Sequence, residues 1–241
     1  MLRKKLENYN VILASKSPRR KFLLKQLGIN FKIRTKDTEE SYPKNLKGKQ
    51  IPIYLSKKKA AAFKNELKPN DLLITADTIV WIKGKILNKP ENPKEATRML
   101  KLLSGKMHTV YTGVCIAFFP PTKKNKKQNY RELKFHAFSV STNVFFKKLT
   151  AQELTSYIQN HQPFDKAGSY GAQECLPIGI NPCSKAEMVF LEKIKNVQLA
   201  KNSTIKRDFP HHVPMINKIS GSYFNVMGLP IVKLFENLNK F

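Results

Sequence analysis

Hydrophobic and polar positions near the start of the chain follow two different periods, one after the other. Residues 11–14 form a compact apolar run, and apolar residues at 22, 23, 24 and 27 follow at helical spacing. Between them, Ser17 is a favoured helix cap and Pro18 fits the first helical position. The stretch therefore predicts a strand, a tight loop and a helix.

The remaining chain is predicted to mix strands and helices. Alternating or short apolar runs predict strands at 31–34, 72–76, 78–82, 86–87, 109–119 and 135–146. Helical spacing predicts helices at 51–67, 93–103, 151–159, 186–195 and 230–238. The strand at 72–76 is expected to end at Asp77, and the lysine-rich segment 120–131 is expected to be a loop. This order of elements favours an α/β (α+β) fold with a mixed, twisted sheet and flanking helices.

Composition changes this picture mainly through the charge. With 44 Lys and Arg residues against 17 Asp and Glu residues, the formal net charge is +27. Such a charge attracts polyanions, including nucleic acid, anionic membrane surfaces and nucleotide phosphates. The excess of basic residues is mostly lysine and is spread through the chain. In nucleic-acid-binding proteins the basic residues cluster on one face or along one helix. Nucleic acid is therefore a possible partner but not an expected one.

Cysteines and apolar runs argue against further classes. The 3 Cys residues are an odd number without CxxC spacing, which argues against a disulfide framework or a zinc site. The first residues are charged and lack the apolar core of a secretory signal, and the apolar runs are too short to span a bilayer. We expect a soluble cytoplasmic protein without a membrane partner.

The loop before the first helix carries one candidate site. Ser15, Ser17 and the first helix amides face the same place as Arg19 and Arg20, which is the chemistry of an oxyanion or phosphate site. The same residues also fit a capped surface helix with two solvated arginines.

The other candidates are an acidic loop, a strand end and two lysines. Glu40 lies in an acidic loop, residues 37–40, and exposed loop carboxylates usually have no function. Asp77 and Thr78 follow a buried strand, where open α/β sheets place ligands and catalytic carboxylates, although an aspartate there is also a common turn residue. Lys59 and Lys89 carry almost no information by themselves among 44 basic residues.

Together these clusters fit one reaction class. Two carboxylates can hold a divalent metal ion and activate a water, while arginine, lysine and helix amides neutralise a polyphosphate and its leaving group. That is the chemistry of phosphoanhydride hydrolysis. The Walker A motif, a GxGxxG motif after a strand and the GxSxG motif are absent from the sequence.

A series of motifs extends over nearly the whole chain. They are LASKSPRR (13–20), Glu40, KA (59–60), ADT (76–78), NKP (88–90), LSGKMH (103–108), DKAGSYGAQ (165–173) and ISGSYFNVMGLP (219–230). In this set and order the sequence closely resembles the Maf family of nucleoside triphosphate pyrophosphatases. The resemblance implies a single domain over residues 1–241, an elongated mixed-sheet fold related to inosine triphosphatases with two lobes around a cleft, and a homodimer.

The resemblance also implies a reaction and a role for each site residue. A triphosphate would be cleaved between its α and β phosphates to give a nucleoside monophosphate and pyrophosphate, with Mg²⁺, Mn²⁺ or a similar divalent ion as cofactor. Asp77 corresponds to the family's proposed proton acceptor, and Glu40 to a carboxylate that holds the metal with Asp77. The phosphate-binding groups correspond to Ser15, Arg19, Arg20, Lys59 and Lys89.

The preferred base is implied by three positions. In the branch of the family that acts on dTTP and UTP, the specificity positions carry Arg, Thr and Gln, which here are Arg19, Thr78 and Gln173. Glutamine offers both a donor and an acceptor, which suits the imide edge of uracil or thymine. The resemblance therefore favours dTTP and UTP, with CTP or modified pyrimidine nucleotides as further candidates. The alternatives are a pyrophosphatase for 7-methyl-GTP or another nucleotide, and a non-catalytic nucleic-acid-binding or cell-division regulatory protein on the same fold.

Three features depart from the family pattern. Gln162 stands where a glutamate is usual, and Glu174 replaces the glycine that normally follows Gln173. Residues 174–213 form an insertion, which makes this region roughly 35 residues longer than in other family members and far longer than an ordinary loop. Because the insertion begins directly after a proposed base-reading residue, it is expected to cover the pocket, to alter specificity or to lie on the rim.

Overall fold

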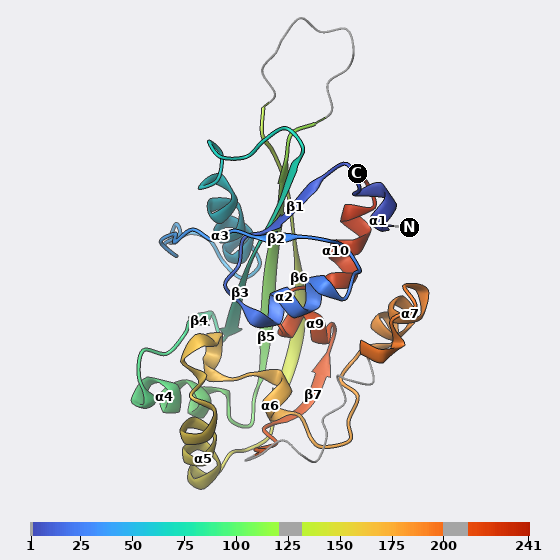
Figure 1. Ribbon diagram of the computed structural model, residues 1–241. Coiled ribbons are helices and arrows are strands. Elements are labelled where there is room, and N and C mark those ends of the chain that lie inside the picture. Colours follow the sequence, from blue (N-terminus) through green and yellow to red (C-terminus); the bar gives the residue numbers. More distant parts are fainter. Residues whose placement is uncertain (1, 121–131, 200–211) are drawn as a thin grey trace, which may run out of the picture.

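A mixed sheet extends along the length of the molecule, with helices packed on both sides (Figure 1). The computed structural model describes residues 2–120, 132–199 and 212–241. Strands β2, β1 and β3 are parallel to one another, and all other strand pairs of the described chain are antiparallel. The 7-stranded sheet has the order β2 (Lys32–Ile33), β1 (Asn10–Leu13), β3 (Asp71–Ile82), β5 (Met107–Phe118), β6 (Lys134–Phe146) and β7 (Ile216–Ser220), with β4 (Lys85–Leu87) paired to β3. The predicted α/β (α+β) fold with a mixed sheet is confirmed.

Helices occur at the predicted places, with several short additions, but the helix predicted at 51–67 ends at Ala61. The helices are α1 (Leu2–Lys5), α2 (Pro18–Lys25), α3 (Gln50–Ala61), α4 (Pro93–Leu103), α5 (Ala151–His161), α6 (Ala172–Cys175), α7 (Lys185–Lys193), α9 (Tyr223–Val226) and α10 (Ile231–Leu238). The short elements α1, α6, α9 and β7 are not indicated by the sequence pattern. Residues 121–131, which are almost all of the predicted lysine-rich loop, lie outside the described residues. None of the helices in the described part of the chain has the length and apolar character needed to span a bilayer.

The starts of α2 and α4 are set by side-chain caps, of which Ser17 is predicted from the sequence. The Ser17 hydroxyl accepts a hydrogen bond from the Arg20 amide at 3.4 Å, and Pro18 opens α2. The Asn92 side chain accepts from the Glu95 amide at 2.9 Å and starts α4. Each such cap satisfies an amide that has no partner within the helix and stabilises the helix by about 1 kcal/mol.

Alternation along β3 builds a core on each face of the sheet. Leu72 and Ile74 pack in one apolar cluster with Leu24 of α2, whereas Leu73 packs in a second cluster with Phe63, just after α3. Figure 1 shows α2 and α3 on the two sides of the sheet. All five side chains are almost completely buried, and burial of such a side chain stabilises a fold by roughly 1.5–3 kcal/mol.

A glycine allows α3 to approach the sheet closely. A Cβ atom on Gly113 of β5 would lie only 2.3 Å from the backbone carbonyl of Pro52. Thr75 of β3 fastens the same helix, because its hydroxyl donates to the Ser56 carbonyl at 2.7 Å. These contacts fix the side of α3 that carries Lys59 against the middle of β3.

The strand that carries Asp77 does not end there, so the prediction of two separate strands, 72–76 and 78–82, is wrong. Strand β3 continues to Ile82 because β5 pairs with it along almost its whole length. On its other edge, β1 pairs with β3 only as far as Ile74, and β4 begins to pair only at Val80. Residues 75–79 therefore face a gap in the sheet edge. Asp77 lies in the middle of that gap.

Helix α7, in the 174–213 insertion, is tied to the body of the protein by a buried carboxylate. Glu187 is 1 % exposed and accepts hydrogen bonds from the Ser222 hydroxyl (2.6 Å) and from the amides of Tyr223 (3.1 Å) and Phe224 (3.0 Å). These groups form the start of α9, so the carboxylate caps that helix from a distant part of the sequence. The ring of Phe190 also packs edge to face on Phe235 of α10.

Candidate active site

A cavity of about 600 Å³ opens beside the gap in β3. Its walls come from the turn between β1 and α2, the loop before α3, α3 itself, the middle of β3, and the segments 165–173 and 226–228. All nine predicted site residues line it: Ser15, Arg19, Arg20, Glu40, Lys59, Asp77, Thr78, Lys89 and Gln173. None of the described residues of the insertion beyond Gln173 lines the cavity.

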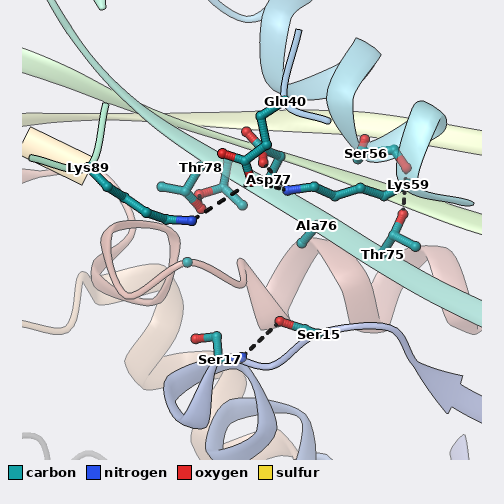
Figure 2. Close-up of polar contacts among 12 residues, drawn as sticks. Ser15, Ser17, Glu40, Ser56, Lys59, Thr75, Ala76, Asp77, Thr78 and Lys89 are labelled. Carbon is teal, nitrogen blue, oxygen red and sulfur yellow. Dashed lines mark hydrogen bonds and ion pairs between the residues drawn. The ribbon is translucent and has the colours of Figure 1, made fainter. Parts of the chain in front are cut away.

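Two carboxylates and two lysines meet at the centre of the cavity (Figure 2). The Lys59 ammonium donates to Asp77 Oδ1 at 2.5 Å and to Glu40 Oε1 at 2.9 Å. Lys89 Nζ approaches Glu40 Oε1 from the opposite side, at 3.8 Å. Asp77 is 6 % exposed, whereas Glu40 and Lys89 are exposed at the mouth. The cluster therefore has one enclosed and one accessible carboxylate, both directed at the same ammonium.

The charge state of Glu40 follows from these contacts. Partial burial would raise the pKa of its carboxyl group, but the hydrogen bond and charge of Lys59, together with the charges of Lys89 and Arg20, outweigh that effect and lower the pKa. Glu40 is therefore a carboxylate at neutral pH, as a cation ligand must be.

Arg20 connects three parts of the cavity wall. Its half-buried guanidinium donates to the Gly228 carbonyl (2.8 Å), the Ala76 carbonyl (2.8 Å) and the Thr78 hydroxyl (3.0 Å). The Ala76 carbonyl lies in the edge gap of β3, where no neighbouring strand pairs with it. Burial lowers the pKa of Arg20, and the charge of Asp77 opposes that shift. Three of the five guanidinium N–H groups thus donate to the protein.

Thr78 and Gly228 complete this part of the wall. The Thr78 hydroxyl lies 3.0 Å from that of Thr112, whose own hydroxyl donates to the Asn225 carbonyl at 2.9 Å. Gly228 has φ +104°, and a Cβ there would lie 3.4 Å from both Arg20 Nε and Thr78 Oγ1. Sequence reasoning gave Gly228 no role, although it lies in the motif 219–230. The preference for glycine arises from the positive φ, which L side chains rarely adopt and which only the folded structure shows.

The mouth of the cavity is bridged by an ion pair. Arg19 Nη1 donates to Asp165 Oδ2 at 3.2 Å, and Asp165 Oδ1 accepts from Lys166 at 2.8 Å. Burial would raise the pKa of Asp165, but Lys166 and Arg19 outweigh that effect and lower it. Asp165 is a second residue that the sequence reasoning did not single out. It joins the arginine turn to the segment that carries Gln173.

The serines of the turn shape the backbone next to the arginines. Ser15 is buried, and its hydroxyl accepts from the Ser17 amide at 3.2 Å (Figure 2). The Ser17 hydroxyl serves as the cap of α2. Both serines line the cavity beside Arg19 and Arg20, and the binding of an anion at this turn stays a prediction.

A buried histidine lies behind the cavity wall. His108 Nε2 lies 2.7 Å from the hydroxyl of Tyr170, which lines the cavity, and His108 Nδ1 has no hydrogen-bond partner among the described residues. Burial lowers the pKa of His108 to about 3. The ring is therefore neutral at the pH of the cell.

Stability is expected to fall in mild acid because of His108. Its folded-state pKa lies below the unfolded value of about 6.5, so the unfolded chain takes up the proton first as the pH falls. The contribution is complete above pH 6.5 and is lost progressively toward pH 3, at up to about 1.4 kcal/mol per pH unit. Urea unfolding of the wild type and of His108→Gln between pH 7 and pH 4 measures this slope. Identical slopes in the two proteins would contradict the assignment.

The side chains at this site can hold a divalent ion only if substrate phosphates supply further ligands. No group of three or more His, Cys, Asp or Glu side chains in the described ranges is arranged to hold a metal. Glu40 and Asp77 form a pair on either side of Lys59 Nζ. Mg²⁺ is commonly held by one or two carboxylates together with substrate phosphates, so this pair is sufficient for such an ion.

Comparison with known proteins shows the family of this chain. The model of a family described as Maf-like protein matches residues 10–184, which is more than two thirds of the chain. The chain belongs to the Maf-like family. All nine predicted site residues lie inside the matched range.

Other members of the Maf-like family match over nearly the full length. A dTTP/UTP pyrophosphatase of Bacteroides thetaiotaomicron is 40% identical over 237 residues, covering 98% of this chain and 97% of the relative. Proteins of the same name from Cytophaga hutchinsonii (41% over 236 residues, 98% of this chain and 85% of the relative) and Flavobacterium johnsoniae (38% over 238 residues, 99% and 98%) are also similar. The Bacteroides and Flavobacterium proteins are thus nearly as long as this chain.

Proposed function

We propose that this protein is a nucleoside triphosphate pyrophosphatase that hydrolyses dTTP and UTP to the nucleoside monophosphate and pyrophosphate. The observation that carries the proposal is the meeting of Asp77, Glu40, Lys59 and Lys89 in one cavity. This arrangement combines a carboxylate that can accept a proton with cations that can bind a polyphosphate. The names of the relatives supply the substrate class.

Asp77 is the proposed proton acceptor in this reaction. Its enclosed carboxylate would take the proton from the water that attacks the α phosphorus, and Lys59 holds the carboxylate in position by a hydrogen bond of 2.5 Å. Glu40 and Asp77 would hold the divalent ion, Mg²⁺ or Mn²⁺, which supplies charge neutralisation at the phosphates when it is bound.

The remaining cations are proposed to bind the phosphate chain. Lys89 is exposed at the cavity mouth and is free to reach the leaving pyrophosphate. The turn with Ser15, Arg19 and Arg20 would stabilise negative charge on the same group. Because Arg20 already makes three bonds to the protein, we assign it two tasks: it holds the wall and directs its remaining N–H groups at phosphate.

Base recognition is proposed to lie with Arg19, Thr78 and Gln173. The half-buried amide of Gln173 can donate to one atom and accept from another on the imide edge of uracil or thymine. The Thr78 hydroxyl is bound to Arg20 and Thr112, so we assign its effect to the shape of the wall. On the resemblance alone, we also propose a homodimer that acts in the cytoplasm.

Pyrophosphate release by the purified protein tests this function. With Mg²⁺ or Mn²⁺, we expect fast turnover of dTTP and UTP and slower turnover of CTP, GTP and 7-methyl-GTP. Preference for 7-methyl-GTP or a purine would overturn the assignment of Gln173 to pyrimidine recognition. No turnover of any nucleotide, with tight and steeply salt-dependent binding of DNA or RNA, would instead favour a nucleic-acid-binding protein on the Maf-like fold.

A further inference from the structure

The backbone that carries Gln173 is held by a buried tyrosine and a glutamate. Tyr157 of α5 is 0 % exposed, and its hydroxyl accepts from the Gly171 amide at 2.9 Å. The same hydroxyl donates to Glu174 Oε2 at 2.7 Å. One side-chain pair therefore fixes the residues on both sides of the segment 172–173.

The fit between these groups is close. A Cβ atom on Gly171 would lie 2.6 Å from Glu174 Oε2, so the carboxylate occupies the space that any larger residue would need. Burial, with the nearby Cys175 and Glu174, raises the pKa of Tyr157 well above its ordinary value. The hydroxyl is therefore always protonated and can donate to the carboxylate at any pH at which the protein is folded.

The same glutamate connects to the other side of the cavity mouth. Glu174 Oε1 lies 3.7 Å from Lys166 Nζ, and Lys166 donates to Asp165, which in turn accepts from Arg19. Glu174 and Lys166 are shielded, with side chains 18% and 11% exposed. A continuous chain of polar contacts thus runs from Arg19 to Gly171, and Glu174 is the link between its two halves.

We propose that Glu174 is a positioning residue for base selection. Through Tyr157 it sets the backbone of Gln173, and through Lys166 and Asp165 it sets the direction of Arg19. This inference rests on the proposed function, because that function assigns Gln173 and Arg19 to the base. Glu174 does not line the cavity, so it acts through the residues that do.

Equilibrium binding of UTP, CTP and GTP tests the inference, because the three ligands share the ribose and the triphosphate and differ only in the base. The variants are Glu174→Ala, Tyr157→Phe and Glu174→Gln. Glu236→Ala serves as a matched control, since Glu236 forms an exposed pair with Lys233 on α10, outside the cavity. Isothermal titration calorimetry gives the affinities, and thermal melting reports whether each variant is folded.

Glu174→Ala and Tyr157→Phe are each expected to reduce the preference for UTP over CTP and GTP about tenfold, the effect of losing one well-placed hydrogen bond. The loss should lie in weaker UTP binding, with CTP and GTP changed little. Glu174→Gln keeps an acceptor for Tyr157 and is expected to recover most of the preference. The control should match the wild type.

Two results with the variants, and one with the wild type, would overturn the inference. One is an unchanged preference in both Glu174→Ala and Tyr157→Phe, and the other is an equal loss of affinity for all three nucleotides, which a purely structural role would cause. A wild type that binds the three nucleotides equally would remove the premise and overturn it as well. Because binding needs no turnover, a wild type that prefers UTP but releases no pyrophosphate would refute the proposed reaction and leave this test valid.

Discussion

The Asp77→Asn variant is expected to lose about a thousandfold of its pyrophosphate release from dTTP, the usual contribution of a positioned general base. Asparagine has the same shape, and its carbonyl can still accept the hydrogen bond that Lys59 now makes at 2.5 Å. It carries no negative charge, however, and so cannot take a proton from water or bind a divalent ion as a carboxylate does. Nucleotide affinity should change only severalfold, because the phosphate-binding cations remain.

Strand β3 offers a matched control for this substitution. Asp71 is 5 % exposed, and its carboxylate accepts from the Lys68 amide at 2.9 Å and from the Asn10 side chain at 3.2 Å. It begins the same strand but lies outside the cavity. Asp71→Asn should therefore keep the turnover number of the wild type. An Asp77→Asn enzyme that releases pyrophosphate at the wild-type rate would refute the proposed role of Asp77.

Arg20→Met is expected to destabilise the protein by about 3 kcal/mol, since two backbone carbonyls and a hydroxyl lose a charged donor together. For a chain of 241 residues this corresponds to a fall of roughly 10 °C in melting temperature. Arg20→Lys should recover little of the loss, because a single ammonium cannot span three acceptors as a planar guanidinium does. Melting followed by circular dichroism measures both variants.

The neighbouring arginine provides the comparison. Arg19 pairs with Asp165 at 3.2 Å, where the two side chains are 26% and 58% exposed. An ion pair this open contributes less than about 1 kcal/mol, so Arg19→Met should melt within a few degrees of the wild type. Equal losses of stability in the Arg19 and Arg20 variants would show that the contacts of Arg20 do not hold the cavity wall together.

Much of the fold follows from local pattern. Helix α4 begins and ends at the predicted residues, with Asn92 as its cap, and the long strands β5 and β6 differ from the predicted ranges by no more than two residues at either end. These elements have strong periodicity and clear boundary residues, which act within one or two turns of chain. A helix as short as α9 shows no such periodicity, although Ser222 caps it by accepting from the Asn225 amide at 3.0 Å. Two further amides at the start of α9 donate to Glu187, which precedes the helix by more than thirty residues in the sequence.

For the candidate site, the sequence selects the residues, and the structure shows the contacts among them. Motifs and residue chemistry select nine side chains, and all nine line one cavity. The contacts among them are not available from the sequence. Lys59 donates to both Glu40 and Asp77. Arg20 donates three hydrogen bonds to the cavity wall, and Arg19 pairs with Asp165. Such contacts join residues from 18 to 208 positions apart, a separation over which no local pattern carries information.

Sequence by itself determined the class of fold and the main strands and helices, because each depends on residue type and short-range periodicity. The set of phosphate-binding residues came from motifs that resemble the Maf family, and it stays a prediction. Tertiary structure alone decided where the cavity opens. Strand β3 runs on through Asp77, while β1 leaves its edge at Ile74 and β4 joins that edge only at Val80. The gap between them exists because strand pairing is a long-range choice, and it leaves Asp77, the proposed proton acceptor, lining the cavity.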